Sequence, residues 1–327
     1  MSTSTQQDRS TSQGETQSAS LVPVLWQLQI SHYVEKVRWA LDYKRIPHIR
    51  RSLPPGLHIQ KARELTGDTS TVPVLTIDGH STGDSTPIIA LIEERWPQPP
   101  LYPEDPAQRR RALELEEFFD EELGPHIRRA FYHELLPHPE LLVPLFTHGD
   151  PLAARTLLEQ FPMLRAGIEQ RFQINAATAS ASRAKVIAAM DRLEREISGI
   201  GYLVGESFTV ADLAAAALFY PVARPPEFPY PTVADEDLPD SWRAFLDPLA
   251  PRPGSRWVSE IYRRHRGQSA ELTTGDTNKA PRPDAANGHS TGNGEPVSNS
   301  QAAFPDLAAS RDRLPAGTTA TREHDPA

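Results

Sequence analysis

The sequence of 327 residues contains no cysteine. Disulfide bonds, thiolate metal sites and every mechanism in which the protein supplies its own thiol are therefore excluded, including Cys-x-x-Cys redox exchange. The sequence also lacks a basic surface signature. Its formal net charge is -9, and its Lys and Arg residues are scattered except for the run Arg109, Arg110 and Arg111. We therefore expect no nucleic acid partner.

Long apolar runs are missing as well. No run approaches the ~20 residues needed to span a bilayer, and the first twenty residues lack the apolar stretch of a signal peptide. We therefore expect a cytoplasmic protein that does not enter a membrane. The hydrophobic content is only 38% and prolines number 32. This composition indicates that part of the chain stays outside any packed core, and we predict disordered tails over 1–20 and 267–327.

The pattern along the remaining chain changes once. From residue 22 to about 96, short strand-like runs alternate with helical stripes in the order β-α-β-α-β-β-α. A proline-rich linker follows at 97–106, and the chain then reads as helices to about 265, including one over 210–220 that should end at Pro221. The sequence therefore predicts an α/β domain over 21–103 and an all-helical domain over 107–266.

A proline stands near the start of the buried run "VPVLTID" (72–78). Proline cannot donate to a strand ladder, so Pro73 either opens the strand or marks backbone that is needed for something else. A cis bond after Val72 would turn the backbone of Val72 away from the sheet, where an extended peptide-like ligand could pair with it.

Two short polar segments precede helical stripes. Asp84 and Ser85 stand before an apolar helix, either as ordinary capping residues or as a site for the carboxylate and ammonium of an amino-acid group. Ser31 precedes the helical stretch from Tyr33 to Lys44. Ser31 either caps this helix or places its hydroxyl at the positive end of the helix dipole, where a thiolate from a bound molecule would be stabilised.

Together these stretches resemble the glutathione transferase superfamily. The resemblance rests on "SHYVEKVRWAL" (31–41), "VPVL" (72–75) with Pro73 as the cis-proline, "GDSTPIIALIEERWP" (83–97) and "YLVGESFTVADLAAAAL" (202–218). It implies a thioredoxin-like N-terminal domain packed on a helical one, in a cytosolic, serine-type enzyme resembling bacterial members. In the last stretch Thr209 and Asp212 are expected to form a structural capping box.

The resemblance also implies roles for individual residues. The backbone of Val72 would pair with the cysteinyl part of glutathione, Asp84 and Ser85 would hold its γ-glutamyl end, and Ser31 would face the sulfur as catalytic residue. Phe131 and Tyr132 either line a pocket for a small hydrophobic electrophile or pack in the core. Glutathione is then a co-substrate; no cofactor and no metal are expected, and the protein is expected to be a homodimer.

Some positions depart from the family pattern. His32 stands where proline is usual, Thr66-Gly67 replaces Asn-Pro, and Thr71 replaces a basic residue, which leaves the glycine carboxylate of glutathione to His58 or Lys61. These departures favour the alternative of a non-catalytic glutathione-binding or protein-interaction module with the same fold. The set of Ser31, Val72-Pro73 and Asp84-Ser85 favours an enzyme.

Overall fold

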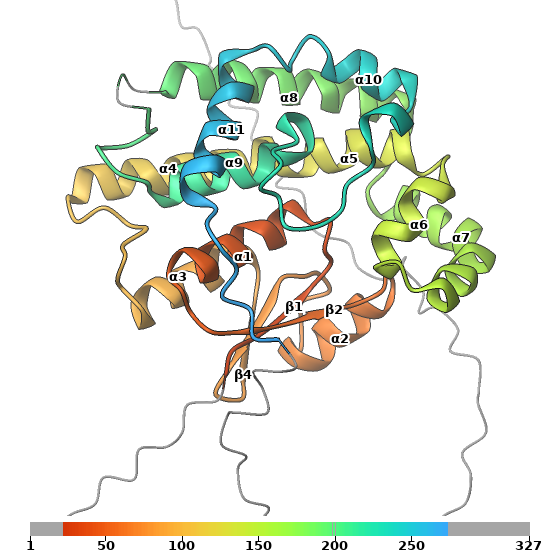
Figure 1. Ribbon diagram of the computed structural model, residues 1–327, viewed down its shortest axis with the longest axis horizontal. Coiled ribbons are helices and arrows are strands. Elements are labelled where there is room, and N and C mark those ends of the chain that lie inside the picture. The colour runs from red at the N-terminus through yellow and green to blue at the C-terminus, as the bar shows by residue number, and fades with distance from the viewer. Residues whose placement is uncertain (1–21, 198, 200, 274–327) are drawn as a thin grey trace, which may run out of the picture.

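The computed structural model describes residues 22–273 of the chain, apart from 198 and 200. Figure 1 shows a small sheet with its helices in the lower half of the view and a larger group of helices above it. The predicted fold class, a thioredoxin-like α/β domain followed by an all-helical domain, is confirmed. The predicted tail over 1–20, and the part of the C-terminal tail beyond 273, lie outside the described residues.

Four short strands form one mixed sheet in the order β2-β1-β3-β4. Strands β1 and β2 are parallel, whereas β3 runs antiparallel to both β1 and β4. The strands are β1 (Val24–Gln27), β2 (Ile49–Ser52), β3 (Val74–Ile77) and β4 (His80–Gly83). The helices between and after them are α1 (His32–Tyr43), α2 (Leu57–Thr66) and α3 (Ser85–Arg95).

The apolar stripes of α1 and α3 form the core beside this sheet. Val34, Val37 and Leu41 of α1 and Ile88 and Ile92 of α3 are fully buried. Burying a side chain of this size stabilises a fold by roughly 1.5–3 kcal/mol. Spacings of three and four residues place these side chains on one face of each helix, and this face packs into the core.

The second domain consists of helices arranged around α9. These helices are α4 (Pro106–Glu122), α5 (Gly124–Leu135), α6 (Pro139–Thr147), α7 (Pro151–Arg171), α8 (Ala176–Glu196), α9 (Val210–Ala223), α10 (Asp240–Leu246) and α11 (Pro253–His265), with a short 3-10 turn η1 (Asp235–Asp237). Helix α9 contacts α1, α4, α5 and α11. Every residue from 210 to 222 is buried, which explains its almost purely apolar sequence.

Helix α9 is capped as predicted at its start but not at its end. The buried Asp212 carboxylate accepts hydrogen bonds from the backbone N–H and the hydroxyl of Thr209, both at 2.9 Å, and burial raises the pKa of Asp212 to about 6. The predicted stop at Pro221 is wrong, because α9 continues to Ala223. A proline removes one backbone donor without preventing helical angles in the next residues. The helix ends instead where Arg224 turns left-handed, with a φ of 50°.

A buried ionic cluster joins the two domains. The Lys36 ammonium of α1 lies 3.1 Å from a Glu116 oxygen and 2.5 Å from an Asp120 oxygen, both on α4. The Thr86 hydroxyl at the start of α3 donates to the same two carboxylates at 3.2 and 2.9 Å. We call Lys36, Thr86, Glu116 and Asp120 the interdomain cluster. It ties α1 and α3 to α4.

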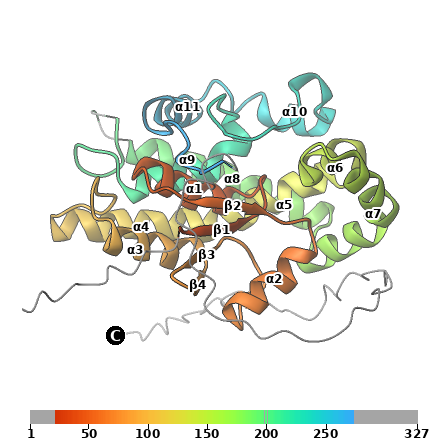
Figure 2. The same cartoon turned by 60° about the horizontal axis from the view of Figure 1, so that its bottom comes forward.

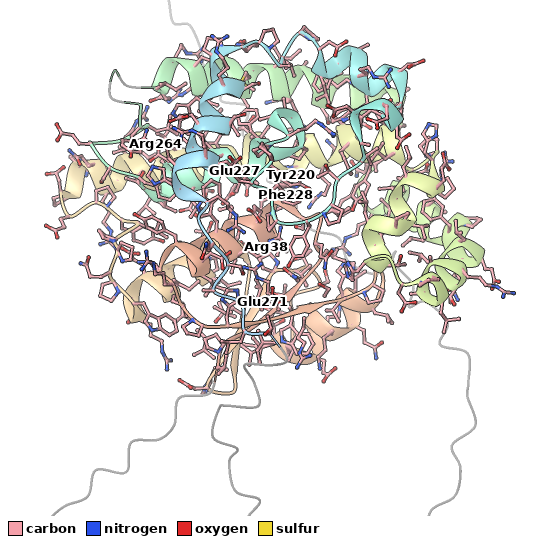
Figure 3. The ribbon with its side chains drawn as sticks, in the orientation of Figure 1. Arg38, Tyr220, Glu227, Phe228, Arg264 and Glu271 are labelled. Carbon is pink, nitrogen blue, oxygen red and sulfur yellow. The ribbon has the colours of Figure 1, made fainter. Side chains whose placement is uncertain are left out.

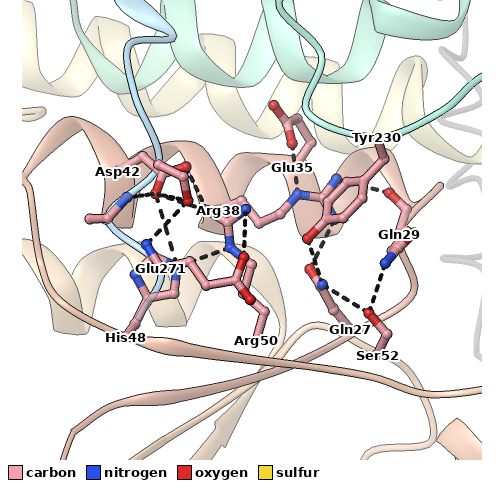
Figure 4. Close-up of polar contacts among 12 residues, drawn as sticks. Gln27, Gln29, Glu35, Arg38, Asp42, His48, Arg50, Ser52, Tyr230 and Glu271 are labelled. Carbon is pink, nitrogen blue, oxygen red and sulfur yellow. Dashed lines mark hydrogen bonds and ion pairs between the residues drawn. The ribbon is translucent and has the colours of Figure 1, made fainter. Parts of the chain in front are cut away.

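The chain after α11 returns to the sheet. Arg266 donates to Glu35 at 2.6 Å and to Asp42 at 2.8 Å, and the backbone N–H of Leu272 donates to the carbonyl of His48 at 2.8 Å. Figure 4 shows Asp42 and His48 in this network, with Glu271 in front of them. The predicted tail boundary at 267 is therefore too early, because residues 267–273 run along the edge of the sheet near β2.

A second part of this network contacts the loop that follows α9. Arg38 of α1 donates to Gln27 at 3.0 Å and lies with its guanidinium carbon 4.7 Å from the centre of the Tyr230 ring. Figure 3 shows Arg38 below Phe228 and Tyr220, close to the junction of the two domains.

Within the described part of the chain, no helix combines the length and the apolarity that crossing a membrane requires.

Candidate active site

A pocket lies between the two domains. Its walls come from the loop after β1, the segments before α2 and β3, and helices α5, α7 and α9. Figures 1 and 2 place α6 and α7 on the side of the molecule where α2 lies, and α7 contributes Leu164, Ile168 and Arg171 to the pocket wall. The polar side chains along it are Ser31, His32, Tyr33, His58, Thr71, Arg128, Tyr132, Arg171 and Tyr220.

Ser31 lines this pocket and is also the N-cap of α1. Its backbone is extended, with φ -79° and ψ 121°, and its hydroxyl oxygen accepts a hydrogen bond from the Val34 N–H at 3.3 Å. A serine hydroxyl that accepts one bond retains its own proton for donation. The cap and a donor role toward a bound anion are therefore compatible, and the α1 N-terminus points its positive end at the same place.

The peptide bond between Val72 and Pro73 is cis, and Val72 lines the pocket. The ladder between β3 and β4 begins with the pair Val74 and Gly83. Val72 therefore precedes the paired part of its strand. In the antiparallel register, Asp84 and Ser85 follow Gly83 on the neighbouring strand, so the structure brings the two predicted segments next to each other.

Asp84 and Ser85 themselves lie outside the residues that line the pocket. Asp84 has a left-handed φ of 70° and caps α3 by accepting the Thr86 N–H at 3.3 Å. Ser85 is 1% exposed, and its hydroxyl makes no hydrogen bond with the part of the chain that the structure describes. A strained non-glycine residue beside an unsatisfied buried hydroxyl is typical of ligand sites.

The residues after Ser31 turn toward the helical domain. His32 is buried and donates through Nε2 to the Gly124 carbonyl at 3.0 Å, and Tyr33 donates to the Asp120 carbonyl at 2.7 Å. Burial, together with the positive charge of Arg128, lowers the pKa of His32 to about 3, so the ring is neutral at pH 7. His32 thus holds α1 against the junction of α4 and α5.

Aromatic rings form much of the other wall. Phe131 and Tyr132 both line the pocket, and Tyr132 stacks on Phe172 with ring centres 6.2 Å apart. Phe131 also packs edge-on against Trp242, with ring centres 6.1 Å apart. The two interpretations of these residues, pocket wall and core packing, are therefore both compatible with the geometry. Tyr220 of α9 donates to the Ile30 carbonyl at 2.6 Å, which fixes the loop before Ser31.

Two arginines in the pocket were not predicted. Arg128 comes from α5 and Arg171 from the end of α7, and each guanidinium carbon lies near the Phe172 ring, at 4.1 and 5.8 Å from its centre. Arg171 also donates to Ser70 at 3.0 Å, just before Val72 in the chain. The sequence carried no signal for them, because α5 and α7 come to face the thioredoxin-like domain only in the tertiary fold.

The predicted candidates for the glycine carboxylate have different surroundings. His58 lines the pocket, and burial together with Arg171 lowers its pKa to about 4. Lys61 does not line it; its ammonium lies 2.8 Å from Glu64 and 4.8 Å from the centre of the Trp26 ring. Among residues 22–273, leaving out 198 and 200, no group of three or more His, Asp or Glu side chains is placed to hold a metal ion.

A thioredoxin-like domain joined to an all-helical domain, with a pocket between them, is the architecture of glutathione S-transferases. A model of the glutathione S-transferase N-terminal domain matches residues 25–100, and one of the C-terminal domain matches residues 143–239. The chain belongs to the glutathione S-transferase superfamily.

Two curated relatives from Drosophila melanogaster are similar to part of this chain. The sequence is 32% identical to probable maleylacetoacetate isomerase 1 of Drosophila melanogaster over 109 residues, which cover 32% of this chain and 44% of the relative. Probable maleylacetoacetate isomerase 2 of the same organism is 30% identical over 113 residues, 33% of this chain and 49% of the relative. The chain thus spans less than half the length of these two curated relatives.

Two solved bacterial structures are similar to the chain at low sequence identity. A glutathione S-transferase from Methylobacterium radiotolerans, in complex with glutathione sulfonate, is 21% identical, with 77% of this chain and 98% of that chain covered and a TM-score of 0.45. A possible glutathione S-transferase from Rhodopseudomonas palustris is 19% identical, with 77% of this chain and 100% of that chain covered and a TM-score of 0.46.

Proposed function

We propose that the protein is a glutathione-dependent transferase in which Ser31 stabilises the glutathione thiolate for attack on an electrophile. The observation that carries this proposal is the position of the Ser31 hydroxyl, at the N-terminus of α1 and in the same pocket as Val72 and the aromatic wall. A hydroxyl donor and a helix N-terminus at one point form a site for a developing anion.

The magnitudes are sufficient for this role. A free thiol has a pKa of about 8.5, and this pKa must fall by about two units for the thiol to be mostly ionised at pH 7. Such a fall corresponds to about 2.7 kcal/mol. A helix N-terminus contributes ~0.3–1 kcal/mol, up to ~2 when partly buried, and a hydrogen bond to a charged group contributes ~1.5–3 kcal/mol. The hydroxyl and the dipole together reach the required value, whereas either one alone falls short or barely reaches it.

In this proposal glutathione lies along the edge of the thioredoxin-like domain. The backbone of Val72 pairs with its cysteinyl part, while Asp84 takes the ammonium and Ser85 the carboxylate of its glutamyl end. The buried, unsatisfied Ser85 hydroxyl supports this placement. At the other end, Arg171 is a better partner for the glycine carboxylate than Lys61, because Arg171 lines the pocket beside Ser70 and Lys61 does not.

The same site would support two kinds of reaction. In a transfer, the thiolate forms a C–S bond and the leaving group departs with its electron pair. In an isomerisation, the thiolate adds to an unsaturated carbon and is expelled again after a bond rotation. The second reaction is a candidate because the curated relatives are named maleylacetoacetate isomerases. The superfamily resemblance further implies a homodimer, which light scattering on the purified full chain tests directly.

The test is the Ser31→Ala variant, measured with glutathione and chlorodinitrobenzene. We expect turnover to fall by about 10- to 1,000-fold, equivalent to ~1.4–4 kcal/mol, with glutathione affinity nearly kept. The pKa of the bound thiol, followed by thiolate absorbance in the ultraviolet, should rise by about one to two units. Ser81→Ala, which removes a hydroxyl from β4 outside the pocket, is the control. If wild type binds glutathione and turns over no electrophile, the non-catalytic module is the better description.

A further inference from the structure

The pocket has an unbalanced charge. Arg128 and Arg171 line it, and no Asp or Glu side chain is among its lining residues in the described part of the chain. Yet the protein as a whole carries a formal net charge of -9. A positively charged pocket with aromatic walls in an acidic protein attracts a ligand that is both negative and partly apolar.

Arg128 and its neighbour Arg129 are used differently. Arg129 donates to the Phe172 carbonyl at 2.9 Å and to the Ser182 hydroxyl at 3.0 Å, so its guanidinium holds α5 to its surroundings. Arg128 makes no hydrogen bond or ion pair with the described residues, and its Nε atom is buried without a partner. A buried, unsatisfied donor on a permanent cation is a group for which a ligand anion compensates.

The location of Arg128 relates it to the reacting sulfur. Its guanidinium carbon lies 5.8 Å from the centre of the Tyr33 ring, and Tyr33 is two residues after Ser31. The same carbon lies 4.1 Å from the centre of the Phe172 ring, which stacks on Tyr132. Arg128 is thus placed between the end of the pocket that holds Ser31 and the aromatic wall proposed for the electrophile.

The carboxylates of glutathione have other partners in the arrangement proposed above. Its glutamyl end is assigned to Asp84 and Ser85 at the start of α3, and its glycine carboxylate to Arg171 beside Ser70 and His58. Arg128, on the α5 wall, remains for the second substrate.

We infer that the electrophile carries a carboxylate, and that Arg128 binds this group while the aromatic wall holds the apolar part of the molecule. This inference deepens the proposed function and rests on it. Arg128 then acts as a specificity-determining residue: the bound carboxylate orients the electrophilic carbon toward the thiolate. When the leaving group is chloride, the C–S bond forms, the C–Cl bond breaks, chloride leaves with the electron pair, and the thiol proton has already passed to solvent.

The test compares a chloronitrobenzoate with its carboxamide, which has the same ring and the same leaving group without the charge. We expect wild type to prefer the acid by about tenfold or more in kcat/KM, since a charge-assisted hydrogen bond has this order of strength. Arg128→Gln should lower kcat/KM for the acid by about 10- to 100-fold and leave the amide within about twofold. Arg128→Lys should recover part of the loss. Arg155→Gln, at an exposed arginine of α7 that does not line the pocket, removes the same charge and should change kcat/KM for neither compound.

A binding measurement separates this inference from the proposed function. The glutathione conjugates of the acid and of the amide are titrated calorimetrically into wild type and Arg128→Gln, so that no turnover is needed. One outcome is that the protein turns over neither electrophile, while wild type binds the acid conjugate more tightly than the amide conjugate and Arg128→Gln does not. This outcome overturns the proposed catalysis and supports the anion site. The inference is overturned if wild type shows equal kcat/KM and equal conjugate affinity for acid and amide. It is also overturned if Arg128→Gln lowers these values equally for both compounds.

Discussion

Replacing Lys36 by methionine should destabilise the protein strongly, because Lys36 is the only cation of the interdomain cluster. Its side chain is fully buried, and Met fills a similar volume without the charge. Removal of the ammonium leaves the carboxylates of Glu116 and Asp120 buried together. Breaking a buried ion pair from one side costs about 3–5 kcal/mol, and we expect a loss of this size in the free energy of unfolding.

The pH dependence of this loss distinguishes the mechanism from simple packing damage. Burial and the neighbouring Asp120 already raise the pKa of Glu116 in the wild type, with Lys36 opposing them. Without Lys36 the folded-state pKa of Glu116 should rise further, because the group that opposes the rise is gone. The folded state then binds more protons than the unfolded state, so the stability of the variant should fall as pH rises from about 5 to about 8.

Urea unfolding, followed by tryptophan fluorescence at several pH values, measures the free energy of unfolding of wild type and variant. The triple variant Lys36→Met, Glu116→Gln and Asp120→Asn removes all three charges and should recover most of the loss. Lys185→Met is the control, since its ion pair with Glu122 is about half exposed and should contribute no more than ~1 kcal/mol. A loss below about 1 kcal/mol in the single variant, or a loss that does not change with pH, would refute this account of the cluster.

Two further predictions concern the glutamyl end of glutathione and the buried histidines. Asp84→Ala should weaken glutathione binding by about tenfold or more while thermal stability changes by at most about 2 kcal/mol through the lost cap, and unchanged affinity in a calorimetric titration would show that the glutamyl end lies elsewhere. Burial lowers the pKa of His32 to about 3 and that of His48 to about 4. The unfolded chain therefore binds protons below about pH 6.5 that the folded state excludes, and stability present above that pH should be lost on acidification by about 1.4 kcal/mol per unit and histidine, partly offset by Asp212 with its raised pKa. A urea midpoint that stays constant from pH 7 to pH 5 would contradict this.

Local sequence patterns sufficed for the order of the elements and for the family. The periodicity of apolar residues predicts whether a segment is a helix or a strand and which of its faces is buried, without reference to distant segments. The apolar run of α9 likewise predicted a buried helix. Ser31, Pro73 and Asp84 were recognisable for the same reason: each stands where a strand or helix begins, and the constraint acts on its own backbone.

Contacts between distant segments could not be predicted in this way. Pro221 was expected to end its helix, but burial of α9 among four other helices carries it to Ala223. Residues 267–273 look like a polar tail, yet Arg266 and the backbone of Leu272 attach them to α1 and to the chain before β2. In both cases the energy comes from partners far away in the sequence.

The candidate site divides along the same line. The sequence by itself determined the side of the site where we propose the thiolate: a hydroxyl at a helix start, a proline before a strand and an acid-serine pair, each defined by neighbours in the chain. Only the tertiary structure decided which side chains lie on the opposite wall of the pocket. Arg128 and Arg171 reach the pocket because α5 and α7 pack across from the thioredoxin-like domain, and the charge that results is a sum over segments that no local pattern contains.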